Sequence, residues 1–149
     1  MSPIDPLVDS LRKWTEIFMH RSMRNFIRYA RESGLSMSQL GALFHIQRGA
    51  SGVSDLGDDI GITNAAASQM LERLVQLQLI QRSEDPHDRR VKQIVLTDKG
   101  QTVLQESIYA RQSWFENLAS SLSDSEKGQI VSALNILVDK ANQLDCYSD

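Results

Sequence analysis

The sequence of 149 residues contains one cysteine, Cys146. A single thiol excludes an internal disulfide, and the C-x-x-C spacing of structural zinc sites is absent. No apolar run approaches the ~18 residues that a membrane span needs, and the acidic N-terminus lacks the apolar core of a signal peptide. These absences predict a cytoplasmic protein with no membrane partner.

Motifs for enzymatic chemistry are also missing. The sequence contains no glycine-rich phosphate loop and no G-x-S-x-G nucleophile motif. Its histidines, His20, His45 and His87, are scattered and form no H-x-x-x-H pair for a metal ion. We therefore expect no cofactor, no metal site and no catalytic residue, and an enzyme is not the expected class.

The sequence does contain enough apolar residues, 41%, for one globular domain of ordinary size. Its net charge of −3 argues against nucleic acid as a partner, but the charge is unevenly distributed. Residues 101–149 hold three basic and seven acidic residues, whereas Arg82, Arg89, Arg90 and Lys92 fall within eleven residues. Because the local field decides what a surface attracts, the basic middle of the chain stays a candidate for binding nucleic acid.

Hydrophobic periodicity predicts two helices in the N-terminal part of the chain. The first covers about 5–32, because apolar residues recur at helical steps at Leu7, Leu11, Trp14 and Phe18. Gly34 is predicted to end it as a left-handed cap. A capping box of Ser36 and Gln39 begins the second helix, which ends near Arg48.

A helix-turn-helix pattern follows. Ser54 is predicted to cap a short helix over 55–60, which Gly61 ends. Thr63 is predicted to cap a longer helix over about 64–77, whose inward residues are Met70, Leu71, Leu74 and Val75.

The pattern then changes from helical to extended. The β-prone runs 79–82 and 92–96 flank the polar turn 83–90, which predicts a hairpin. One helix is predicted over about 97–119, and a capping box at residues 123–126 begins the last helix.

A short helix, a glycine turn, a second helix and a basic hairpin make up a winged helix-turn-helix, whose second helix enters the major groove of DNA. Asn and Gln bond bidentately to adenine there, Ala contacts the thymine methyl group, and a Thr hydroxyl can reach a phosphate. Residues suited to these contacts begin the second helix: Thr63, Asn64, Ala65, Ser68 and Gln69. The alternative is that these are ordinary solvent-facing helix residues.

The hairpin tip carries two neighbouring arginines, Arg89 and Arg90. An arginine on a narrow tip can enter the minor groove, where an A·T-rich stretch concentrates negative potential. Asp88 could hold Arg90 extended by a charge-assisted hydrogen bond. The alternative is a plain solvated charge run.

The sequence resembles the MarR (multiple antibiotic resistance regulator) family continuously over about 36–100. The Asp-x-Arg of Asp88 and Arg90, followed by Leu96-Thr97, is the most specific part. The matching stretches are Val53-Ser54-Asp55-Leu56, Gly61-Ile62-Thr63, Ala67-Ser68-Gln69-Met70-Leu71-Glu72-Arg73-Leu74, Leu79-Ile80-Gln81-Arg82, Asp85-Pro86-His87-Asp88-Arg89-Arg90 and Leu96-Thr97-Asp98-Lys99-Gly100.

This resemblance implies a mainly α fold: a winged helix-turn-helix core with a two-stranded β wing, flanked by N- and C-terminal dimerisation helices. It implies one domain over 1–149, with a DNA-binding lobe at 36–100 and dimerisation helices at 1–35 and 101–149. The recognition helix would be 63–76 and the wing 79–96, with Arg90 in the minor groove. Two residues depart from the common family pattern, which has alanine at Gly57 and glycine at Gln78.

The resemblance also implies a homodimeric transcription regulator, usually a repressor released by a small ligand. We expect it to bind double-stranded DNA at inverted-repeat operators. Together with the residue chemistry, it gives these predicted DNA contacts: Ser54, Thr63, Asn64, Ala65, Ser68, Gln69, Arg73, Asp88, Arg89, Arg90 and Lys92.

Apolar stripes on the terminal helices predict the homodimer. The residues expected at the interface are Leu7, Leu11, Ile130, Leu134, Leu137 and Leu144. A small aromatic or amphipathic effector is expected where aromatic and polar residues meet. The candidates are Trp14, Phe18, Ser22, Asn25, Phe44, His45 and Trp114, for which the alternative is a simple role in the core.

The competing function is a winged-helix module for protein interaction without specific DNA readout. It would keep the fold and the dimer but would need neither a base-reading helix nor an arginine-tipped wing. The outward Asn64, Ser68 and Gln69 and the Arg89-Arg90 tip therefore favour DNA.

Overall fold

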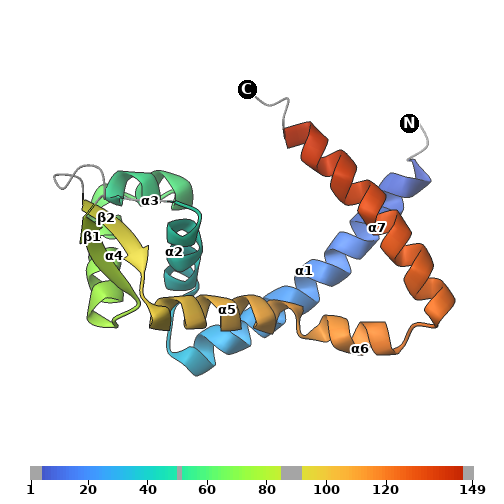
Figure 1. The fold of residues 1–149 in the computed structure, drawn as a ribbon, viewed down its shortest axis with the longest axis horizontal. Helices are drawn as coiled ribbons and strands as arrows, with labels where there is room; N and C mark the ends of the chain where they lie inside the picture. Colours follow the sequence, from blue (N-terminus) through green and yellow to red (C-terminus); the bar gives the residue numbers. More distant parts are fainter. Residues whose placement is uncertain (1–4, 50–51, 85–91, 146–149) are drawn as a thin grey trace. The chain divides into compact units, whose positions relative to one another are not determined.

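The computed structural model describes residues 5–49, 52–84 and 92–145. The chain divides into two compact units, Met1–Gln112 and Ser113–Asp149. The first unit is formed by α1 Pro6–Ser33, α2 Met37–Gln47, α3 Val53–Ile60, α4 Asn64–Gln76, β1 Ile80–Glu84, β2 Lys92–Leu96 and α5 Asp98–Gln112 (Figure 1). The predicted mainly α winged helix-turn-helix with a two-stranded wing is confirmed.

Hydrogen bonds between nearby residues define the ends of the first two helices, and the predicted signals at Gly34 and Ser36 are among them. The Asp5 carboxylate accepts from the Leu7 N–H at 2.8 Å, and Gly34 ends α1 in the left-handed conformation with φ 69°. The Ser36 hydroxyl accepts from the Gln39 N–H while the Gln39 side chain accepts from the Ser36 N–H. These local bonds satisfy the backbone groups that a helix end leaves unpaired.

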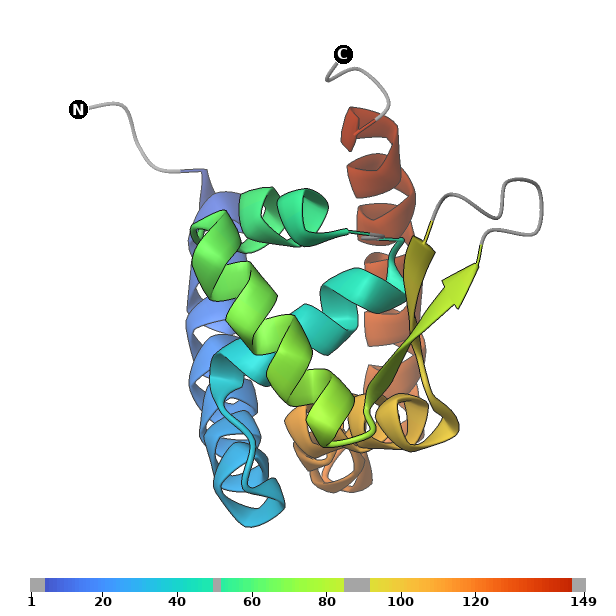
Figure 2. The same ribbon diagram turned by 90° about the vertical axis from the view of Figure 1, so that its left-hand side faces the viewer.

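The hydrophobic core of the first unit lies between α2, α4, the hairpin and the inner faces of α1 and α5. Figure 2 shows α4 beside the hairpin, and α4 also packs on α3. Burying one large aliphatic side chain contributes roughly 1.5–3 kcal/mol. The largest apolar side chains that are fully buried at this centre are Leu40, Leu43, Leu56, Leu74 and Leu79.

Two details of the predicted helix-turn-helix are wrong. The short helix α3 begins at Val53 with Gly52 in the N-cap position, so Ser54 lies inside the first turn and makes no cap. Val75 is 43% exposed, because the buried face of α4 follows Ala67, Leu71 and Leu74. Val75 lies at the edge of the helical face that Ala67, Leu71 and Leu74 define, and this edge is open to solvent.

The helix predicted over 97–119 is also wrong, because two helices occupy this stretch. The second unit begins at Ser113, between α5 and α6 Trp114–Ser120. Serine favours helix ends over interiors because its hydroxyl competes for backbone hydrogen bonds. The apolar spacing continues through Ser113, and periodicity alone therefore does not reveal the break.

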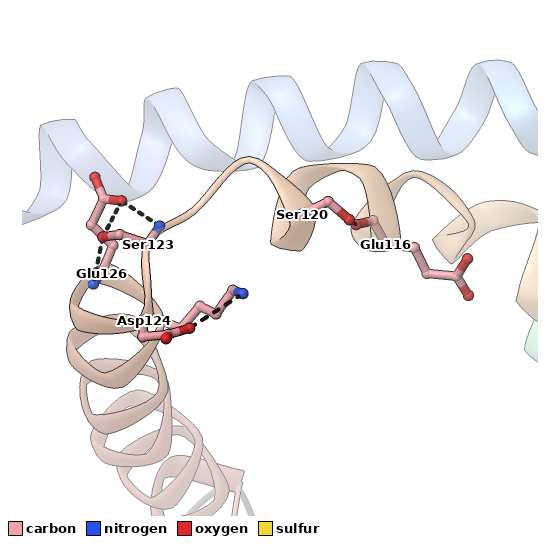
Figure 3. A network of polar contacts seen from close by, with 6 residues as sticks. Glu116, Ser120, Ser123, Asp124 and Glu126 are labelled. Atoms are coloured by element: carbon pink, nitrogen blue, oxygen red, sulfur yellow. Dashed lines mark hydrogen bonds and ion pairs between the residues drawn. The ribbon is translucent and has the colours of Figure 1, made fainter.

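The second unit contains α6 and the long helix α7 Asp124–Asp145. The predicted capping box is present: the Glu126 carboxylate accepts from the Ser123 N–H at 2.8 Å and from its hydroxyl at 2.7 Å (Figure 3). The hydrogen bond from the backbone N–H, and then that from the hydroxyl, lowers the pKa of Glu126. A carboxylate at this end also suits the positive pole of the helix.

Candidate nucleic-acid interface

The recognition helix α4 presents one polar face to solvent. Its predicted base-reading residues, Asn64, Ala65, Ser68 and Gln69, are all exposed, while the opposite face packs into the core. Thr63 is the N-cap, and its hydroxyl accepts from the Ala66 N–H at 3.2 Å. The N-terminal half of α4 thus has one face held by the core and the opposite face open to solvent, which is the arrangement needed to enter a major groove.

The turn into α4 depends on two glycines, one within α3 and one directly after it. Gly61 ends α3 with φ 67°, a backbone conformation that residues with a Cβ adopt at a cost in free energy. A Cβ at Gly57 would lie 3.1 Å from the Ile62 carbonyl oxygen and 3.2 Å from Asn64 Oδ1. The glycine at 57 therefore gives the turn room to pass close to α3, and the Asn64 amide lies on that side of the helix.

The wing begins as a regular antiparallel pair. Ile80 lies opposite Leu96, Arg82 opposite Ile94, and Glu84 opposite Lys92, which is the last pair within the described residues. The predicted tip residues Asp88, Arg89 and Arg90 lie outside the described residues. The structure describes the backbone of Lys92 in β2 and not its side chain.

Ser54 and Arg73 complete the predicted set of DNA contacts. Both are exposed. Arg73 lies in the last turn of α4, where it donates to the Gln76 side chain at 3.3 Å. It is therefore farther along the helix than the base-reading group.

The exit from α4 is a left-handed turn built on a non-glycine residue. The Leu79 N–H donates to the Leu74 carbonyl and the Gln78 N–H to the Val75 carbonyl, at 3.0 and 2.9 Å. These two bonds define a Schellman cap, in which the residue at Gln78 takes a positive φ, here 59°. Gln78, where the common family pattern has glycine, thus keeps the exit turn in place but adopts its backbone conformation at a cost in free energy.

Residues at the start of α5 donate hydrogen bonds to consecutive backbone carbonyls of this exit turn. The Lys99 ammonium donates to the Leu77 carbonyl at 2.9 Å, and the Thr97 hydroxyl donates to the Gln78 carbonyl at 2.6 Å. The Thr97 N–H donates to the Leu79 carbonyl at 3.1 Å. We call Thr97 and Lys99, with these bonds, the exit clamp. It joins the recognition helix and the wing to α5.

α5 is in turn held against α1 by a polar contact. The Tyr29 hydroxyl lies 3.1 Å from the Val103 carbonyl oxygen and 3.0 Å from Glu106 Oε2. Burial, and then the hydrogen bond and negative charge of Glu106, raises the pKa of Tyr29 to about 12. The contact therefore requires the neutral phenol.

Three of the predicted effector residues line one cavity of about 320 Å³ in the first unit. They are Phe18 and Ser22 from α1 and Phe44 from α2. Asn25 lines a separate depression on α1, and His45 Nδ1 lies 3.2 Å from Asp59 Oδ2.

The remaining two aromatic candidates lie elsewhere. Trp14 is an exposed residue of α1, whereas Trp114 is a buried residue of the second unit with its ring edge against Phe115.

Sequence reasoning missed the wall that α5 contributes to this cavity, which includes Ile108, Arg111 and Gln112. A signal was available. Arg111 follows Leu104 and Ile108 at helical spacing, so a charged residue stands in the apolar stripe of α5.

The predicted dimer residues are not inward-facing in the described chain. Leu7 and Leu11 of α1 are exposed, as are Ile130, Leu134 and Leu144 of α7. Leu137 is half-buried. Because several large apolar side chains in each helix contact solvent, these faces are candidates for a partner surface.

Comparison with known proteins shows which protein family this arrangement resembles. The family model described as MarR family matches residues 33–91, which include α2, α3, α4 and β1. A curated relative, the HTH-type transcriptional repressor MdtR of Bacillus subtilis, is 24% identical over 127 residues, covering 85% of this chain and 82% of MdtR. Over residues 33–91, the chain is similar to the MarR family.

Other curated relatives of this chain are matched over only 51–59% of their own length. Solved structures share the fold. The transcriptional regulator Tm0710 from Thermotoga maritima aligns with a TM-score of 0.79 at 22% identity, over 96% of this chain and 99% of Tm0710. S. aureus MepR, solved as a mutant bound to an oligodeoxyribonucleotide, aligns with a TM-score of 0.66 at 20% identity, over 88% of this chain and 97% of MepR.

MepR has also been solved bound to ethidium bromide, with a TM-score of 0.64 and 20% identity over 87% of this chain and 95% of MepR. In the present structure, no helix within the described ranges is long and apolar enough to cross a membrane. Over the same residues, no group of three His, Cys, Asp or Glu side chains is placed to hold a metal ion.

Proposed function

We propose that this chain is a transcriptional regulator of the MarR family that binds DNA sequence-specifically, and a repressor that a small molecule releases from its operator. The observation that carries the proposal is the exposed polar face at the N-terminal half of α4, supported from behind by the core. MepR, which shares the fold, is known in a DNA-bound form, and MdtR is named as a repressor.

In this proposal, α4 enters the major groove and the wing reaches the minor groove. Ser68 and Gln69 would contact base edges, and Thr63 would contact a phosphate with its hydroxyl. Arg90 at the wing tip would supply the minor-groove contact, with Asp88 orienting it. The regular pairing of β1 with β2 supports a wing that extends toward that tip.

The proposed regulator is a homodimer that reads an inverted repeat. Exposed apolar side chains support this, among them Leu134 at 46% and Leu144 at 71% exposure. A twofold axis would place two recognition helices about one DNA turn apart, roughly 34–36 Å. Light scattering at micromolar concentration should give the dimer mass for wild type and a lower mass for Leu134→Glu. Asn135→Glu is the matched control, and a monomeric wild type would contradict the dimer.

The cavity lined by Phe18, Ser22 and Phe44 is the proposed effector site. Its volume of about 320 Å³ lies at the lower end of known small-molecule pockets. The ethidium complex of MepR supports the idea that this fold accepts a flat organic molecule. Release from DNA requires that the effector binds the DNA-competent and DNA-incompetent forms with different affinities.

The test of DNA recognition is fluorescence anisotropy with duplex DNA from the region upstream of the chain's own gene. Gln69→Ala should weaken binding and relax the sequence preference by about 1–3 kcal/mol. Gln101→Ala is the matched control, because it removes an exposed amide from α5 instead of α4. Arg90→Ala should weaken binding. It should also lower the number of counterions released on binding, as measured by the salt dependence of the affinity, by about one.

The competing winged-helix interaction module makes the opposite prediction. If wild type binds no inverted-repeat DNA at low salt, DNA recognition is contradicted and the interaction module is favoured. If Gln69→Ala and Gln101→Ala behave alike, α4 does not read bases in the proposed way.

A further inference from the structure

Gly57 of α3 and Asn64 of α4 lie against each other where the two helices meet. Gly57 is buried, whereas Asn64 is the first residue of α4 and is exposed. A Cβ built on Gly57 would lie 3.2 Å from Asn64 Oδ1, which is closer than ordinary van der Waals contact. The Asn64 amide therefore occupies space that a side chain at residue 57 would need.

Two further atoms border the same space. The Ile62 carbonyl oxygen lies 3.1 Å from the Cβ position of Gly57, and the Ala67 Cβ lies 3.8 Å from it. The Ile62 N–H also donates to the Gly57 carbonyl at 2.9 Å, which ties the turn to α3. We call the space beside the Gly57 Cα, bordered by Ile62, Asn64 and Ala67, the glycine seat.

The Asn64 amide is the neighbour of the glycine seat that can move most easily. Ile62 belongs to a hydrogen-bonded turn, and Ala67 is buried on the inner face of α4. Asn64 Oδ1, in contrast, is the end of an exposed side chain with two rotatable bonds. A methyl group placed in the seat should therefore displace the amide before it displaces the turn.

We propose that Gly57 is a positioning residue for DNA recognition, because the glycine seat sets the direction in which the Asn64 amide meets a base pair. An amide distinguishes bases only when its donor or acceptor lies opposite the complementary group on the base edge. A side chain that is already in that direction loses less conformational entropy on binding. The inference rests on the proposed function, since it requires α4 to lie in the major groove, whereas the contact between Gly57 and Asn64 does not.

The experiment measures base discrimination at each position of one duplex. A pool of duplexes with randomised sequence is selected on wild type, and fluorescence anisotropy then compares the selected duplex with each of its single base-pair changes. Asn64→Ala should lose about tenfold or more of the discrimination at one base pair of each half-site, which identifies the pair that Asn64 reads. Gly57→Ala should lose most of the discrimination at that pair and little elsewhere.

Two further variants assign this loss to the glycine seat. Gly41→Ala is the matched control, because it makes the same change within α2, where an added Cβ meets no atom within 4 Å. It should keep the wild-type pattern of discrimination. Gly57→Ala combined with Asn64→Ala should discriminate like Asn64→Ala alone, because without the amide the seat has nothing to position.

Thermal unfolding tests the contact without DNA, at one protein concentration. The change in Tm caused by Asn64→Ala should be more positive in the Gly57→Ala protein than in wild type, since it removes the atom that the added methyl group meets. Equal changes in the two backgrounds would overturn the seat. If Gly57→Ala does not fold, folding of the double variant supports the seat, and failure of both shows that the Ile62 carbonyl is the obstacle and overturns it.

The outcomes separate this inference from the proposed function. If wild type selects no sequence from the pool, the proposed function is contradicted, and the positioning role with it. If wild type selects a sequence but Asn64→Ala loses no discrimination, only the positioning role is contradicted. The same holds if Gly57→Ala keeps the discrimination at the base pair that Asn64 reads, or loses it equally at all positions.

Discussion

The exit of the recognition helix contains a strained residue that can be relieved. Gln78 has φ 59°, the left-handed region that glycine adopts freely and other residues adopt at a cost. It is the only non-glycine residue with positive φ within the described ranges. Its side chain is exposed, so removing it should remove little packing. We therefore predict that Gln78→Gly stabilises the folded chain.

The size of the effect follows from two opposing contributions. Because glycine adopts the left-handed conformation freely, Gln78→Gly should remove about 1–2 kcal/mol of backbone strain from the folded chain. Glycine also makes the unfolded chain more flexible, which offsets about 0.4–1 kcal/mol of that gain. The net expectation is a stabilisation of about 0.5–1 kcal/mol, or a few degrees in Tm for a chain of this length. The exit-clamp bond from Thr97 to the Gln78 carbonyl involves only the backbone of residue 78 and should remain.

Gly34 offers the reverse experiment in the same protein. It ends α1 with φ 69°, close to the value at Gln78, and a Cβ added there would meet no atom within 4 Å. Gly34→Ala thus introduces backbone strain without a steric clash, and should destabilise by about 0.5–1 kcal/mol. The two substitutions should have opposite signs and similar sizes.

Urea unfolding followed by circular dichroism at 222 nm measures both free energies of unfolding. All proteins must be compared at one concentration, since association with a second copy would make the stability concentration-dependent. The slope with urea should not change, which would show that the unfolded state exposes the same surface. Destabilisation by Gln78→Gly, or equal signs for the two variants, would refute the assignment of strain to residue 78.

Two further substitutions test the contacts of α5. A Cβ on Gly100 would overlap the Leu79 carbonyl oxygen, at 1.9 Å, so Gly100→Ala should cost about 3 kcal/mol or more in urea unfolding. A cost below about 1 kcal/mol would show that α5 and the α4 exit are not in such close contact. Tyr29→Phe should cost about 0.5–1.5 kcal/mol at neutral pH by removing the contacts with Val103 and Glu106. Because the folded-state pKa of Tyr29 is raised to about 12, that stabilisation is complete below pH ~10 and lost as the pH rises toward 12; ultraviolet titration at 295 nm should lose its highest-pH component in the variant.

The sequence was sufficient to predict the elements whose signals are local. The cap at Thr63, the capping box of Ser36 and Gln39, and the left-handed end at Gly34 all depend on residues a few positions apart. Such signals act through short hydrogen bonds within one turn, so a single sequence contains them completely. The choice of the α4 residues that face solvent follows in the same way from helical spacing.

Features that depend on distant residues could not be predicted. The role of Lys99 becomes visible only when the Leu77 carbonyl is placed beside it, 22 positions earlier in the chain. Arg111 stands in an apolar stripe, but sequence does not show that Phe26 lies against its guanidinium. The break at Ser113 also escapes periodicity, because the apolar spacing runs through it.

A single helix, α5, connects the candidate ligand site with the candidate DNA site. Arg111 lies near one end of α5, while Thr97 directly precedes the other end, and 15 residues of helix span about 22 Å. A helix moves as a rigid element, so a shift at Arg111 would reach the carbonyls of Gln78 and Leu79 through Thr97. Those carbonyls lie between α4 and the wing, and in the proposed function the relative placement of these two elements decides whether both grooves of DNA can be contacted together. The exit clamp is therefore the place where a ligand could change DNA affinity without touching any residue that contacts DNA.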